Sequence, residues 1–190
     1  MVEDLLTHPG ESDDDAILVS QHRAGDRRAF DELVRKYQRR VYGLTLRYVR
    51  NREDAKDLAQ RAFVRAFEAI DGFRGGSSFR TWLYRIAINL ALNHLRDHKP
   101  QVEVDAALDE QCWIPAVGDA RIVDDETRRA LLRALDELPP KQRLVLELRV
   151  YEELPFREVA TIARCSENAA KVTFHHAVKR LRAVMERNAT

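Results

Sequence analysis

Apolar side chains recur at helical spacing along most of the first half of the chain. One series spans residues 30–44 and a second spans 55–70, with a polar turn at 50–54 between them. Both follow the i, i+3, i+4, i+7 pattern of a helix that buries one face. The apolar positions are Phe30, Leu33, Val34, Tyr37, Val41, Leu44, then Ala55, Leu58, Ala59, Ala62, Phe63, Ala66, Phe67 and Ile70.

A third series (Trp82, Leu83, Ile86, Ala87 and Leu90) predicts another helix, and a short leading helix over residues 15–24 ends at Gly25. Residues 71–78 interrupt the pattern with glycine and serine, and glycine favours non-helical backbone. No segment alternates with a period of two for long. The first half is therefore predicted to be an α-helical bundle.

The second half predicts four shorter helices, over residues 127–138, 141–151, 155–163 and 166–187. Pro139 and Pro140 end the first of them, and Pro155 is tolerated in a first turn. Ser166 is a good N-cap for the last helix. Because only a short turn separates the last two helices, they are predicted to form a helix-turn-helix.

Charge is segregated along the 190 residues, although 32 Lys and Arg nearly balance 31 Asp and Glu. Residues 23–52 hold ten bases and three acids, and residues 171–187 hold five bases and one acid. Residues 100–126 between these basic segments hold eight acids and one base, and residues 1–15 hold six acids and no Lys or Arg. Local basic segments of this kind permit nucleic-acid binding at near-zero net charge.

These patterns predict an all-α protein of two small helical domains joined by a flexible acidic linker, the second with a helix-turn-helix. The predicted segments are an acidic N-terminal extension (1–14), a first domain (15–99), the linker (100–124) and a second domain (125–190). The alternative interpretation of the acidic segment is a surface loop within one domain. Two cysteines, no apolar run of bilayer length and no secretion signal predict a cytoplasmic protein.

Two helices carry polar stripes suited to DNA. On the last helix Asn168, Lys171, His175, Lys179 and Arg182 are spaced 3, 4, 4 and 3 apart. Amide and cationic groups read base edges and phosphates in the major groove, although the same spacing also occurs on ordinary solvated helices.

The helix after the glycine-rich break carries the second stripe, Arg85, Asn89, Asn93 and Arg96. The loop before this helix offers Phe73, Arg74, Ser77 and Ser78, and it is predicted either to receive an extruded base or to be a plain flexible turn. Trp82 is predicted to lie in the core. A third polar set, Asp54, Asp57 and Gln60, fans across one helix side and by itself is typical of solvated surface.

Enzyme and metal signatures are absent from the sequence: it has no P-loop, no HExxH motif and no nucleophile elbow. His94 and His98 at i, i+4 could bind a metal, but a polar helix end is the commoner explanation. No catalysis, cofactor or small-molecule substrate is therefore expected.

Four stretches taken together, residues 29–44, 53–67, 73–96 and 138–182, resemble the extracytoplasmic-function (ECF) group of bacterial sigma factors in the sigma-70 family. The resemblance covers residues 15–187 apart from the linker. It implies an alternative sigma factor that binds the largest subunits of core RNA polymerase, directs it to specific promoters and helps open the −10 element. It also implies a linker that threads toward the polymerase active-centre channel.

The resemblance assigns three sets of residues. The polymerase-binding set is Asp54, Asp57, Leu58, Gln60 and Phe63. The set for the −10 element of promoter DNA is Phe73, Arg74, Ser77, Ser78, Arg85, Asn89, Asn93 and Arg96. The set for the −35 element is Ser166, Glu167, Asn168, Lys171, Thr173, His175, Lys179 and Arg182.

The chain departs from the family pattern at the recognition helix. Asn168, Ala169 and Ala170 stand where many relatives carry Gly-Thr-Val, and Thr173, His176 and Val178 partly replace an arginine-rich stretch. Each lost cation removes one potential phosphate contact.

The resemblance also implies an anti-sigma partner, often membrane-bound, which would hold the factor near the membrane. The alternatives are a stand-alone helix-turn-helix regulator and a paralogue that binds polymerase without opening DNA.

Overall fold

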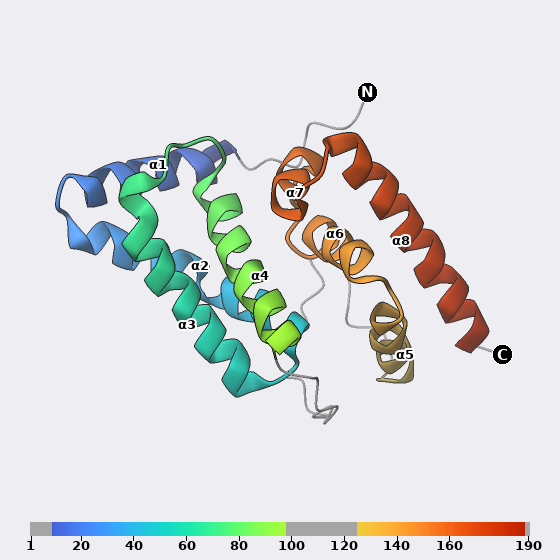
Figure 1. Ribbon diagram of the computed structural model, residues 1–190. Coiled ribbons are helices and arrows are strands. Elements are labelled where there is room, and N and C mark those ends of the chain that lie inside the picture. The colour runs from blue at the N-terminus through green and yellow to red at the C-terminus, as the bar shows by residue number, and fades with distance from the viewer. Residues whose placement is uncertain (1–8, 98–124, 189–190) are drawn as a thin grey trace. The chain divides into compact units, whose positions relative to one another are not determined.

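The structure, a computed structural model of the chain, describes residues 9–97 and 125–188, and these form helices without any strand (Figure 1). They fall into two compact units. The first contains α1 (Pro9–Arg23), α2 (Arg27–Val49), α3 (Arg52–Ala69), the 3₁₀ helix η1 (Ile70–Gly72) and α4 (Phe79–Asp97). The second contains α5 (Asp125–Asp136), α6 (Pro140–Val150), α7 (Phe156–Ala163) and α8 (Glu167–Asn188).

The predicted all-α class is confirmed for the described residues. The leading helix begins at Pro9 rather than at residue 15, so part of the predicted acidic extension is helical. Proline is compatible with this start because the N–H that it lacks has no partner in a first turn. The predicted linker, 100–124, lies outside the described residues.

Helix α2 is the central element of the first unit, because it packs against α1, α3 and α4. Its buried stripe includes Leu33, Tyr37, Val41 and Leu44, as the spacing predicts. The facing side of α3 is rich in alanine, which lets the helix axes approach closely, and α3 and α4 run side by side (Figure 1). Two residues assigned to the core lie elsewhere: Phe67 is 47% exposed and Trp82 is half-buried.

Polar groups inside the first unit connect its helices. Asp15 of α1 is 1% exposed, forms an ion pair with Lys36 of α2 at 2.7 Å and accepts a hydrogen bond from the Tyr37 hydroxyl. The buried Thr45 hydroxyl donates to the carbonyl of Ala55 at 2.9 Å, which joins α2 to the first turn of α3. Paired in this way, the buried polar groups contribute to a single packing arrangement.

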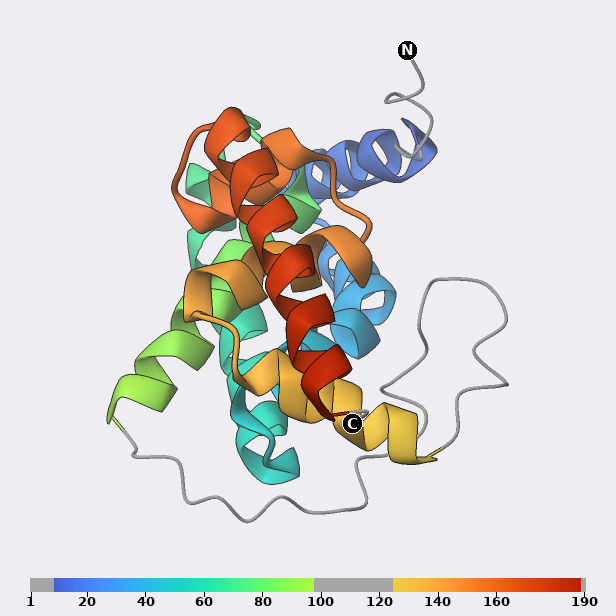
Figure 2. The same cartoon turned by 90° about the vertical axis from the view of Figure 1, so that its right-hand side faces the viewer.

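In the second unit α8 packs against three helices: α7 lies beside its first half and α5 beside its last (Figures 1 and 2). The interface is built from small and branched residues of α8, among them Ala170, Ala177 and Val184. Buried Glu147 of α6 pairs with Arg143 at 2.8 Å, and Arg143 also reaches Asp136 at the end of α5. Arg149 donates to the Leu154 carbonyl and lies over the Phe156 ring, which fixes the turn into α7.

Replacing Asp15 by alanine is expected to lower the free energy of unfolding of the first unit by about 2–4 kcal/mol. The buried Tyr37 hydroxyl would lose this acceptor, and Lys36 would lose its ion pair with a buried carboxylate. The measurement is urea denaturation of the full chain followed by Trp82 fluorescence, with Trp113 replaced by phenylalanine. Asp14→Ala is the matched control because Asp14 is exposed on the same helix. Equal losses in the two variants would contradict the role of Asp15.

Candidate functional site

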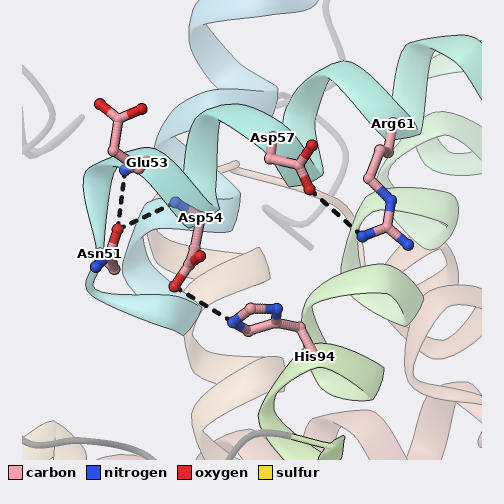
Figure 3. Close-up of polar contacts among 6 residues, drawn as sticks. All are labelled: Asn51, Glu53, Asp54, Asp57, Arg61 and His94. Carbon is pink, nitrogen blue, oxygen red and sulfur yellow. Dashed lines mark hydrogen bonds and ion pairs between the residues drawn. The ribbon is translucent and has the colours of Figure 1, made fainter.

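The exposed side of α3 is set by the way the helix begins. Arg50 adopts a left-handed conformation with φ 55°, and Asn51 follows as N-cap. The Asn51 side-chain oxygen accepts from the backbone N–H groups of Glu53 and Asp54, at 2.9 and 3.1 Å (Figure 3). This cap satisfies two of the unpaired N–H groups of the first turn. It therefore fixes the residue at which α3 starts and the direction in which its acidic side chains leave the helix.

The predicted polymerase-binding residues divide into an exposed and a buried group. Asp57 and Gln60 are exposed, and Asp57 lies 3.4 Å from Arg61 one turn along (Figure 3). Asp54 instead turns toward α4 and lies 3.4 Å from His94 Nε2. Leu58 and Phe63 are buried and hold α3 in the core, and their role as contact residues stays a prediction.

An apolar extension of the same face was missed in the sequence. Val64 is 50% exposed, Phe67 is 47% exposed, and with Asp57 and Gln60 they are spaced 3, 4 and 3 apart. Residues at this spacing lie along one side of a helix. The spacing of Val64 and Phe67 from Gln60 is the signal that could have identified them. Phe67 also fits the apolar core pattern, and its ring centroid lies 5.1 Å from that of Phe30. We call Asp57, Gln60, Val64 and Phe67 the α3 face.

An aromatic trio lies where the glycine-rich loop meets α4. The Phe73 ring centroid is 5.1 Å from that of Trp82 and 6.2 Å from that of Phe79, and Phe79 and Trp82 are 5.7 Å apart. Phe79 is buried, whereas Phe73 and Trp82 remain half-exposed. Partly exposed aromatic rings of this kind are platforms on which bases stack.

The loop hydroxyls are not equally available. Ser78 caps α4, because its Oγ accepts from the Thr81 N–H at 3.2 Å and contacts the Thr81 hydroxyl at 2.8 Å. Ser78 therefore has a structural role as a cap, and its contact with DNA stays a prediction. Ser77 is half-buried, Arg74 is exposed, and Gly75 has φ 71°, a conformation that favours glycine.

The polar stripe of α4 continues from the trio. Trp82, Arg85, Asn89, Asn93 and Arg96 are spaced 3, 4, 4 and 3 apart, so Trp82 belongs to the side of the stripe. Arg85 and Asn89 are half-buried, and Asn93 and Arg96 are exposed. Arg96 pairs with Asp97 at 3.2 Å, while no side chain of the described residues pairs with Arg85 or Asn89. The groups nearest the loop are therefore available to a ligand.

Two helix caps define the turn of the helix-turn-helix in the second unit, a backbone cap at the end of α7 and a side-chain cap at the start of α8. Arg164 ends α7 in a left-handed conformation with φ 51°, and its N–H donates to the carbonyl of Ala160. Ser166 caps α8 as predicted, with its Oγ accepting from the Ala169 N–H at 3.1 Å. The rings of Phe156 and Phe174, 5.6 Å apart, pack α7 against α8.

The exposed side of α8 differs in part from the predicted stripe. Lys171 is half-buried, pairs with Glu167 at 3.1 Å and lies over the Phe156 ring, and Thr173 is also half-buried. Val172, which the sequence analysis did not single out, is 49% exposed four residues after Asn168. The exposed side contains Asn168, Val172, His175, His176, Lys179 and Arg182.

The described residues contain neither a group of metal ligands nor a membrane-spanning helix. In residues 9–97 and 125–188, no three His, Cys, Asp or Glu side chains are grouped so that they could hold a metal ion. His94, proposed as half of a metal pair, contacts Asp54, and His98 lies outside the described residues. None of the helices in the same ranges is long and apolar enough to cross a membrane.

Comparisons with known families match both units. Residues 33–101 match the Sigma-70 region 2 model, and residues 128–181 match the Sigma-70, region 4 model. The RNA polymerase sigma-H factor of Pseudomonas aeruginosa is 41% identical over an alignment of 163 residues that covers 80% of this chain and 83% of that protein. The ECF RNA polymerase sigma-E factor of Escherichia coli K12 is 36% identical over 160 residues, with the same two shares.

A solved structure of CnrH in complex with the cytosolic domain of CnrY is also similar, with a TM-score of 0.69 and 26% identity over 92% of this chain and 98% of that one. The two family models cover more than half of the chain, in the order and in the units that carry the α3 face, the α4 stripe and the helix-turn-helix. The chain therefore belongs to the sigma-70 family, in its extracytoplasmic-function group.

Proposed function

We propose that this chain is an alternative sigma factor that binds core RNA polymerase, directs it to specific promoters and helps open the −10 element. The observation that carries the proposal is that one chain holds both a region 2 match over 33–101 and a region 4 match over 128–181. A stand-alone helix-turn-helix regulator would need only the second of them. The region 2 match therefore argues against that alternative.

In this proposal the first predicted domain binds the polymerase and opens the −10 element, and the second binds the −35 element. The α3 face binds the largest subunits of the polymerase, with Asp57 and Gln60 as its polar part. The exposed apolar residues beside them, Val64 and Phe67, would be buried by the partner, and a few well-packed side chains supply most of the affinity of an interface. Asp54 acts indirectly, because its contact with His94 joins α3 to α4.

Promoter opening is assigned to the loop and the α4 stripe. An extruded base would enter beside Arg74 and Ser77 and stack on the half-exposed rings of Phe73 and Trp82. Arg85, Asn89, Asn93 and Arg96 would then contact the edges and phosphates of the unpaired strand. Capture of extruded bases offsets an unstacking cost of a few kcal/mol per step, so binding energy alone drives the opening and no catalysis is required.

The −35 element would be bound as duplex by the exposed side of α8. Asn168 is the candidate for an adenine edge, and His175, Lys179 and Arg182 are candidates for base edges or phosphates. Ser166 and Glu167 start the helix, so they lie where backbone N–H groups can meet a phosphate. Lys171 and Thr173 stay in the proposed set with smaller expected contributions because both are half-buried.

An anti-sigma partner and a cytoplasmic site of action complete the proposal. CnrH was solved with the cytosolic domain of CnrY, and that complex supports a comparable inhibitor for this chain. Such an inhibitor would hold the factor near the membrane if it were itself membrane-bound. Because core polymerase and promoter DNA are in the cytoplasm, the free factor would act there.

The proposed function is tested by run-off transcription. Purified full-length chain mixed with sigma-free core polymerase and a library of randomised promoters should initiate at specific sequences, because two separate elements are recognised at once. Core polymerase alone and heat-inactivated chain are the controls. If no specific start site is enriched, the proposed function is wrong.

Replacing both Asp57 and Gln60 by alanine is expected to weaken the affinity for core polymerase about tenfold, since both exposed side chains belong to the proposed contact. The unfolding midpoint should stay unchanged because neither residue is in the core. Affinity is measured by fluorescence titration of labelled chain with core polymerase. Arg65→Ala is the matched control, because Arg65 is exposed on α3 and is not three or four residues from any member of the α3 face. Unchanged affinity in the double variant would contradict the assignment of the α3 face.

Replacing Lys179 by alanine is expected to reduce the slope of log affinity against log salt by about one, the value for one lost phosphate contact. Lys171→Ala should change the slope less, since Lys171 is half-buried and lies over the Phe156 ring, whereas Lys179 is exposed. The measurement is the affinity for a duplex carrying the selected −35 sequence at several salt concentrations. An equal or larger effect of Lys171→Ala would show that the exposed side of α8 is not the DNA-binding face.

A further inference from the structure

Arg23, the last residue of α1, holds the beginning of the glycine-rich loop. The two hydrogens of its Nη2 are shared among three carbonyl acceptors, those of Ile70 at 2.9 Å, Asp71 at 3.1 Å and Phe73. These acceptors lie 47, 48 and 50 residues further along the chain. One side chain of α1 therefore determines where the backbone leaves η1.

The carbonyls of Ile70 and Asp71 belong to the end of a helix, where hydrogen-bond donors are few. The last carbonyls of a helix have no N–H partner within it, and they form the negative end of the helix dipole. The chain supplies one local bond, from the Phe73 N–H to the Ile70 carbonyl at 3.1 Å. A guanidinium keeps its charge at all physiological pH values and can donate to several acceptors, so it suits the remaining positions.

The contact reaches the aromatic trio through a single residue. Arg23 donates to the backbone carbonyl of Phe73. The ring centroid of the same Phe73 lies 5.1 Å from that of Trp82. Beyond Phe73 the backbone has no regular structure until Phe79, and Gly75, with φ 71°, lies in open space, since a Cβ atom there would meet nothing within 4 Å. With so few local constraints, the loop depends on its fixed ends.

We propose that Arg23 is a positioning residue for promoter opening: it holds the loop 73–78 and the Phe73 ring in the arrangement that receives an extruded base. This inference rests on the proposed function of the loop. Arg23 does not need to touch DNA, because it acts through the backbone carbonyls of η1 and Phe73. Nothing in the local sequence of the loop reveals this dependence.

The test compares Arg23→Gln, Arg23→Lys and the control Arg27→Gln, all in a chain with Trp113 replaced by phenylalanine. Arg27 is exposed four residues away, and its side chain pairs with no other described residue. Emission of Trp82 is recorded without DNA. Promoter opening by holoenzyme is then measured by permanganate reactivity on a promoter selected with the wild-type chain, alongside affinities for core polymerase and for −35 duplex.

Arg23→Gln is expected to reduce promoter opening about tenfold, the effect of losing a charge-assisted hydrogen bond, and to shift Trp82 emission to longer wavelength. Affinities for core polymerase and for −35 duplex should remain within about twofold of wild type, since both faces lie outside the contacts of Arg23. Arg23→Lys should restore part of the opening, because an ammonium group still donates to carbonyls. Arg27→Gln should behave as wild type.

Normal opening by Arg23→Gln, or unchanged Trp82 emission, would overturn the proposal. A parallel loss of polymerase affinity, −35 affinity and unfolding midpoint would also overturn it, because Arg23 would then be a general stabilising residue. Failure of the wild-type holoenzyme to open any promoter would contradict the proposed function instead. The emission comparison, which needs no DNA, would still decide whether Arg23 holds the loop.

Discussion

The burial of one side of α2 is the constraint on which the first unit depends. Leu33, Tyr37, Val41 and Leu44 have no exposed surface, and the helix that carries them packs against α1, α3 and α4. Because the apolar sides of α3 and α4 pack against this helix, their polar sides must face outward. The directions of the α3 face and of the α4 stripe therefore follow from the packing of side chains that take no part in binding.

Helix caps fix where the candidate groups emerge, and they also remove some groups from use. Asn51, Ser78 and Ser166 each bond a backbone N–H in the first turn of a site helix. A cap sets the first residue of its helix, while the directions of the polar side chains behind it follow from the turn of about 100° per residue relative to the buried side. The same bond engages the capping side chain, so the Ser78 hydroxyl must exchange this bond to meet a ligand.

Ion pairs on the candidate faces differ from those inside each unit. The ion pairs on the candidate faces, Asp57 with Arg61 and Lys171 with Glu167, join partly or fully exposed groups, and such pairs contribute little. They can exchange for a partner's charges without a large cost. By contrast, the pairs of Asp15 and Glu147 involve a buried carboxylate, and they join helices within a unit.

The sequence by itself determined the helices, the two polar stripes and the family, because helical periodicity, caps and proline or glycine breaks are local properties. Only the tertiary structure decided which members of each stripe are available. Leu58 and Phe63 share the helix of Asp57 but lie in the core, whereas Phe67 and Trp82 fit an apolar pattern and yet reach the surface. The contact of Arg23 with three carbonyls far along the chain has no sequence signal, because it depends on α1 ending beside η1. Periodicity tells which side of a helix is apolar, but the neighbouring helices decide how much of that side is covered.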